Sequence, residues 1–147
     1  MMIKKYKIGN FAVEIKSQED FRNEEPYSLF LYDGEQTDYS VNVEFSSDIP
    51  KKIENPYYES QDRVCDYDNG VLRCCYKSRD DEEEYYACRT VAGKNINIVI
   101  EEKYRSMLRA DVIFSLIGIE ELVAENNGCI LHSSFIEKDG GAVLFTG

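Results

Sequence analysis

The chain has 147 residues, with 28 acidic and 17 basic side chains and a formal net charge of −11. Hydrophobic residues make up 43% of the chain, which is enough to fold around a core and excludes an intrinsically disordered sequence. So acidic a surface repels phosphate backbones, which argues against general nucleic-acid binding. The same charge favours a basic peptide or protein partner. The alternative is that the acidity only keeps the protein soluble.

The N-terminal stretch MMIKKYKIGN is too polar for a signal peptide. No apolar stretch approaches the roughly 20 residues that are needed to span a bilayer. We therefore expect a cytoplasmic protein that does not enter the membrane.

The cysteines are odd in number and contain no C-x-x-C pair: Cys65, Cys74, Cys75, Cys88 and Cys129. In a reducing cytosol this pattern predicts free thiols. A hairpin centred near Asp81 would place Cys74 opposite Cys88. A zinc site needs about four ligands, and no other two are found. We interpret the pair as two small buried hydrophobic side chains.

The first hundred residues have the alternating pattern of β-strands. Gly9-Asn10 separates two such runs, 3–8 and 11–15, and predicts a tight hairpin. Asn69-Gly70 predicts a second hairpin. Further strands are predicted at 38–46, 85–91 and 96–102, with a long loop at 46–62.

From Lys103 the apolar residues follow helical spacing, and they surround the helix between 112 and 119. This pattern predicts one long buried helix over about 104–125, which ends at Asn127-Gly128. Two strands around a turn at Asp139-Gly140-Gly141 then predict a C-terminal β-hairpin. The expected fold class is α+β with a mostly antiparallel sheet.

Residues 131–147, LHSSFIEKDGGAVLFTG, combine a strand that carries a histidine, a short acidic glycine turn and an apolar strand that ends in Thr-Gly. This pattern resembles the entry to the phosphate loop of HPr kinase/phosphorylase and its relatives, among them the HPr-kinase-related kinases found with peptide-modifying gene clusters. In that family the last strand runs into a glycine-rich loop that cradles phosphate. Gly147 matches the first glycine of that loop, and His132 matches the histidine on the preceding strand.

The resemblance implies the N-terminal part of an ATP-dependent serine kinase that acts on a peptide or protein. Residues 1–102 would form a β-rich N-terminal region, and residues 103–147 would lead into a P-loop core truncated at Gly147. The remaining loop glycines, the lysine and the Ser/Thr of the family motif are missing, so we expect this chain by itself to be catalytically incompetent. ATP and Mg²⁺ are expected for the complete parent protein, and no cofactor or metal is expected for this chain. His132 is the candidate catalytic residue, in the complete protein only.

Other interpretations of these residues remain open. His132 could be a partly buried histidine that bonds a neighbouring hydroxyl or carbonyl group. A Ser–His nucleophile pair would have to use Ser134, because adjacent strand residues such as Ser133 point to the opposite face, and no third, orienting residue is evident. The acidic run from Asp80 to Glu84 is typical of a solvated loop, although it could also bind a basic peptide.

The alternative function is a self-contained, non-enzymatic binding module. Such a module would hold a basic peptide by strand addition at exposed sheet edges. If the chain is instead a kinase fragment, the strand Ala142 to Phe145 would leave an unpaired apolar edge, which predicts a homo-oligomer or aggregation, whereas a stand-alone module predicts a monomer.

Overall fold

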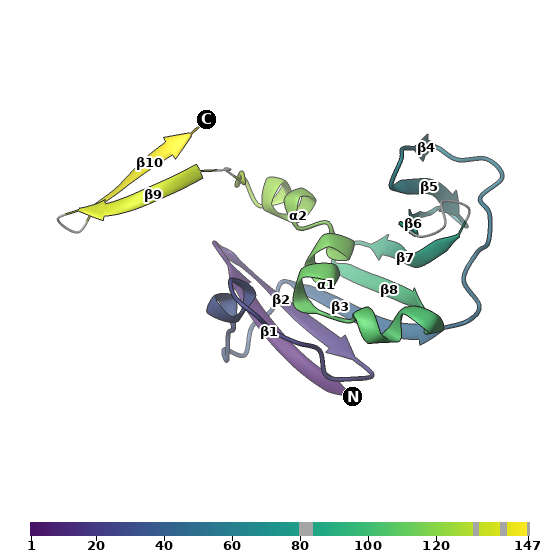
Figure 1. The fold of residues 1–147 in the computed structure, drawn as a ribbon, viewed down its shortest axis with the longest axis horizontal. Coiled ribbons are helices and arrows are strands. Elements are labelled where there is room, and N and C mark those ends of the chain that lie inside the picture. The colour runs from purple at the N-terminus through teal and green to yellow at the C-terminus, as the bar shows by residue number, and fades with distance from the viewer. Residues whose placement is uncertain (80–83, 131–132, 139–140, 147) are drawn as a thin grey trace.

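A computed structural model of the chain describes residues 1–79, 84–130, 133–138 and 141–146, with side chains as far as residue 130 (Figure 1). The strands are β1 (Met2–Ile8), β2 (Phe11–Ser17), β3 (Tyr39–Ser46), β4 (Tyr58–Glu59), β5 (Arg63–Asp68), β6 (Val71–Lys77), β7 (Tyr85–Ala92), β8 (Asn95–Glu101), β9 (Ser133–Lys138) and β10 (Gly141–Thr146). The helices are the 3₁₀ segments η1 (Tyr27–Phe30) and η2 (Glu102–Met107) and the α-helices α1 (Ala110–Ile117) and α2 (Ile119–Glu125).

Strands β1 to β8 form one mixed sheet in the order β1-β2-β3-β8-β7-β6-β5-β4. Only the β2–β3 and β3–β8 pairs in this sheet are parallel, and the other neighbours are antiparallel. The predicted α+β class with a mostly antiparallel sheet is therefore confirmed. β3 is parallel to β2 because the long connection 18–38, which includes η1, carries the chain back before the next strand begins.

Both predicted tight hairpins are confirmed. Ile8 pairs with Phe11 across the first turn, and Asp68 pairs with Val71 across the second. At the second turn Asn69 has φ 51° and Gly70 has φ 80°, so both central residues adopt the positive φ that a type I′ turn requires.

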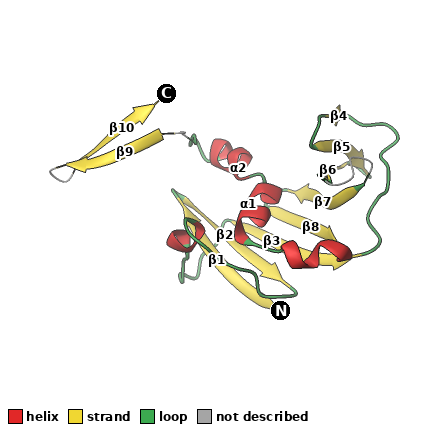
Figure 2. Ribbon diagram, in the orientation of Figure 1, coloured by secondary structure: helices red, strands yellow, loops and turns green. Residues whose placement is uncertain are grey.

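The helices cover one face of the sheet (Figure 2). On that face Val41 and Ile98 are fully buried and share one hydrophobic core with Ile113 and Leu116 of α1. The opposite side of the central strands carries residues such as Glu14, Asn42 and Asn97, which are half-buried or exposed. This two-layer arrangement follows from the alternation of apolar and polar residues along each strand.

The predicted long helix over about 104–125 is wrong. The segment forms η2, α1 and α2, separated by Arg109, which is extended at φ −141°, and by Gly118, which is left-handed at φ 75°. Arg109 lies in a parallel bridge with Arg22, and the N–H of Ala110 donates to the Arg22 carbonyl at 2.9 Å. This tertiary contact and the glycine break a segment that apolar spacing alone predicts to be continuous. None of the helices within the described residues is long and apolar enough to cross a membrane.

Strands β9 and β10 pair with each other in antiparallel fashion, from Ser133 with Thr146 to Lys138 with Gly141, and form a separate two-stranded sheet. Residues 139 and 140 of the predicted turn lie outside the described residues. The structure thus gives a strand pair, not the complete C-terminal hairpin that the sequence predicts.

Two cystine bridges replace four of the predicted free thiols. Cys65 is bonded to Cys74 and Cys75 to Cys88, while Cys129 is free and exposed. The predicted Cys74–Cys88 pairing is wrong by one residue. A bulge between residues 76 and 77 shifts the β6–β7 register, so that Cys75 lies opposite Cys88.

Candidate functional site

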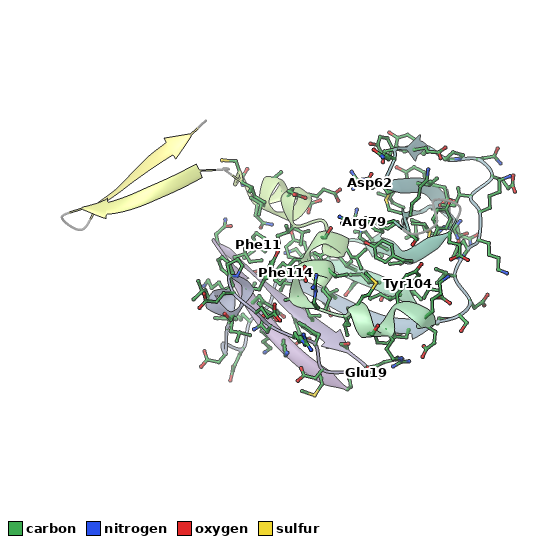
Figure 3. The ribbon with its side chains drawn as sticks, in the orientation of Figure 1. Phe11, Glu19, Asp62, Arg79, Tyr104 and Phe114 are labelled. Carbon is green, nitrogen blue, oxygen red and sulfur yellow. A yellow bond between two sulfur atoms is a disulfide. The ribbon has the colours of Figure 1, made fainter. Side chains whose placement is uncertain are left out.

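A cleft of about 900 Å³ opens between the ends of strands β5 to β7 and the helices η2 and α1. Three tyrosines line it, Tyr76 on β6, Tyr86 on β7 and Tyr104 on η2, and we call it the tyrosine cleft. Asp62 and Arg79, which also line it, are labelled with Tyr104 in Figure 3 and come from segments that are distant in sequence.

The three tyrosine rings form a continuous aromatic wall. The ring centroids of Tyr76 and Tyr86 are 6.2 Å apart, and those of Tyr86 and Tyr104 are 6.0 Å apart in an edge-on arrangement. Lys77 pairs with Tyr85 and Tyr76 with Ala87, so Tyr86 is the extra residue of the β-bulge. The bulge therefore brings Tyr86 to the face that carries Tyr76.

Hydrogen bonds orient this wall. The hydroxyl groups of Ser78 and Tyr104 are 2.8 Å apart and share a hydrogen bond. The Tyr76 hydroxyl donates to the Leu116 carbonyl of α1 at 3.4 Å. The rings are thus tied both to the sheet and to the helix layer.

Burial raises the pKa of the Tyr86 hydroxyl to about 12. Burial also raises the pKa of Tyr76, although the nearby cations of Arg89 and Arg63 oppose this effect. Both hydroxyls therefore stay neutral near pH 7 and can donate and accept hydrogen bonds.

Three of the cations that line the cleft, Arg63, Lys77 and Arg109, have acidic partners. Arg109 makes a two-pronged pair with Asp111, at 2.7 and 3.1 Å, and the Lys77 ammonium lies 2.8 Å from a Glu59 oxygen. Burial lowers the pKa of Arg63, but Tyr76 and Glu121 raise it by more, so its net shift is upward. These three cations are already paired, whereas Arg79 adds an exposed positive charge to the lining beside Tyr86.

Arg89 holds the helix layer in place beside the cleft. It lies on β7 with 2% of its surface exposed, and it donates to the Ile117 carbonyl at 2.7 Å and to a Glu121 carboxylate oxygen at 2.8 Å. Its cation lies at the C-terminal end of α1, where the helix dipole favours positive charge. This contact sets the position of Gly118 and Glu120, which line the cleft.

The candidate site residues predicted from the sequence, His132 and Gly147, lie outside the described residues, and so do residues 80–83 of the acidic run. Ser133 and Ser134 belong to β9, of which only the backbone is described. Among the residues that the structure describes, no group of three or more His, Cys, Asp or Glu side chains is placed to bind a metal ion.

Sequence reasoning missed the tyrosine cleft. The eleven tyrosines of the chain were the available signal, and they predict only amphipathic sheet surfaces. The cleft combines residues from 61 to 120. The cleft also depends on the β-bulge between β6 and β7, and the local sequence pattern does not predict this bulge.

The fold and the cleft define the chain as an α+β domain with one helix-covered mixed sheet. Comparison with protein-family models, with curated proteins and with solved structures finds no match.

Proposed function

We propose that this chain is the acceptor-recognition part of an HPr-kinase-like, ATP-dependent serine kinase that acts on a peptide or protein. Two features support this proposal. The run from Leu131 to Gly147 resembles the entry to the family's phosphate loop. The described backbone of this run also contains two antiparallel strands, β9 and β10, in keeping with the two strands of the resemblance.

We assign the chemistry of phosphoryl transfer to residues outside the part that the structure describes. Such transfer needs convergent backbone amides, a lysine and a metal to stabilise charge. The described residues offer no metal-binding group of three or more ligands. We therefore assign no residue of this part to ATP or Mg²⁺, and His132 and Gly147 stay predictions.

The tyrosine cleft is the observation that carries the recognition role. Its volume of about 900 Å³ is large enough for several side chains of an extended segment. Tyrosine rings bind apolar and cationic side chains on their faces, and their hydroxyls bind peptide groups. Asp62 and Glu120 add negative charge at the lining.

We infer that the peptide is basic. The chain carries a formal net charge of −11, which attracts a cationic segment at long range. Pairs with Glu121, Glu59 and Asp111 offset the cations Arg63, Lys77 and Arg109, so these three do not repel such a peptide strongly. Arg79 adds one exposed positive charge to the lining, which the long-range charge of the chain outweighs.

The same cleft also supports the second candidate, a non-enzymatic peptide-binding module. Binding at the tyrosine cleft requires neither nucleotide nor metal. The two candidates differ only in whether a bound serine is phosphorylated.

The test is phosphoryl transfer from labelled ATP to serine-containing peptides, catalysed by the product of the full reading frame. We expect transfer, and we expect Tyr86→Ala to raise the KM for the peptide about tenfold or more while the KM for ATP is unchanged. Tyr67→Ala is the matched control, because Tyr67 is 59% exposed and does not line the cleft. Peptide binding without any transfer would reject the kinase and leave the binding module.

A further inference from the structure

Two disulfides use adjacent residues of β6 and fasten its two neighbouring strands. Cys74 is bonded to Cys65 on β5, and Cys75 is bonded to Cys88 on β7. Adjacent strand residues point to opposite faces. Cys65 and Cys74 accordingly lie in the core under the helices, whereas Cys75 and Cys88 lie in a second core with Ile53, Val64 and Tyr85.

The two disulfides differ in how well their strands are held by other means. β5 pairs with β6 over its whole length from Arg63 to Asp68, but its other neighbour, β4, contributes only Tyr58 and Glu59. By contrast, β6 and β7 each have full-length neighbours on both sides. Cys65–Cys74 therefore ties the last long strand before the β4 edge of the sheet, and a strand near an edge opens more readily than a central one.

β5 also supplies part of the tyrosine cleft. Arg63 lies two residues from Cys65 and on the same face, directly opposite Tyr76 in the β5–β6 register. Asp62 precedes the strand, and both Arg63 and Asp62 line the cleft. If β5 loses order, this side of the cleft loses its shape.

We propose that the Cys65–Cys74 disulfide is a redox switch that controls the order of β5 and thereby the shape of the tyrosine cleft. The reductant is a dithiol, either a small molecule or a protein. Two electrons and two protons pass to the chain, the bond between the sulfurs breaks, and two cysteine thiols form while the dithiol becomes a disulfide.

Cys65 and Cys74 are both buried, so the reductant reaches them when the short β4 edge and β5 open locally. In the oxidised state β5 is held in register and the cleft is formed. In the reduced state β5 exchanges with open forms. The proposal rests on the proposed function only in taking the cleft as the binding site.

Hydrogen exchange followed by mass spectrometry tests the switch without any assay of activity. We compare the oxidised wild type, the wild type in dithiothreitol, C65A/C74A, and the matched control C75A/C88A. Reduction and C65A/C74A should each speed exchange in residues 57–67 by about tenfold or more, with β3 and β8 unchanged. Reoxidation should restore protection in the wild type, and C65A/C74A should no longer respond to dithiothreitol in this segment.

Equal exchange of residues 57–67 in the oxidised and reduced wild type would overturn the proposal. So would a response to dithiothreitol in this segment that survives in C65A/C74A but is lost in C75A/C88A. Alkylation of folded, air-oxidised protein that labels Cys65 and Cys74 as free thiols would also overturn it. These readouts do not depend on phosphoryl transfer, so a failure of the proposed kinase activity remains distinguishable from a failure of the switch.

Discussion

The guanidinium of Arg89 occupies the space that a side chain at residue 118 would need. Gly118 ends α1 in the left-handed conformation at φ 75°, and a Cβ atom there would overlap Nη1 of Arg89. The same guanidinium bonds the carbonyl of Ile117, the last residue of α1. The break between the two α-helices and the buried cation thus depend on each other.

Gly118→Ala should lower the free energy of unfolding by about 3 kcal/mol, because it adds an overlap with Arg89 to the cost of a left-handed alanine. Gly93→Ala is the matched control. Gly93 has φ 62° but open space around it, so only the backbone cost of about 1 kcal/mol applies. Urea unfolding of both variants measures the difference, and equal losses would show that Arg89 does not occupy this space.

Arg89→Lys should destabilise the protein by about 2 kcal/mol, because one ammonium group cannot bond both the Ile117 carbonyl and Glu121 in the geometry of the guanidinium fork. Arg73→Lys is the control, since Arg73 pairs with Asp66 and Asp68 on a half-exposed part of the sheet. We expect it to cost less than about 1 kcal/mol. If thermal unfolding showed that Arg73→Lys loses as much stability as Arg89→Lys, the result would contradict this account.

Stability should fall at alkaline pH because of two tyrosines, the buried Tyr6 and the half-buried Tyr86. Burial raises the pKa of Tyr6 and of Tyr86 from the usual 10.0 to about 12. In the unfolded chain these hydroxyls ionise near pH 10, whereas the folded protein keeps them neutral to about pH 12. The stabilisation is therefore complete below pH 10 and is lost as the pH rises to 12.

The Tm should drop by about 3–6 °C between about pH 9.5 and 12, after discounting for the partial exposure of Tyr86. Calorimetry over this range measures the loss. The double variant Tyr6→Phe with Tyr86→Phe should have a Tm that depends less on pH. If its Tm changed with pH as steeply as that of the wild type, other groups would cause the alkaline loss of stability.

Much of the sheet is predictable from the sequence, because alternation and turn chemistry are local. Asn69-Gly70 specifies its hairpin wherever the rest of the chain lies. The helices are less predictable, since the break at Arg109 depends on a backbone contact with Arg22, far away in sequence. Apolar spacing cannot detect such a contact.

The cleft and the Cys75–Cys88 disulfide escape prediction for a related reason. Both depend on a single bulge beside Tyr76, which turns Tyr86 toward the cleft and places Cys75, not Cys74, opposite Cys88. One extra residue in a ladder reverses which face each side chain takes. Nothing in the local alternation marks where that residue falls.

The most direct test of the account is to map where a peptide binds. Pooled serine-containing peptides rich in lysine and arginine are titrated into the protein, and the amide resonances are followed by NMR. We predict saturable shifts at Tyr76, Tyr86 and Tyr104, abolished or weakened by Tyr86→Ala and retained in Tyr67→Ala. No saturable shift, or shifts confined to surfaces remote from the tyrosine cleft such as η1, would contradict the claim that this cleft recognises the acceptor.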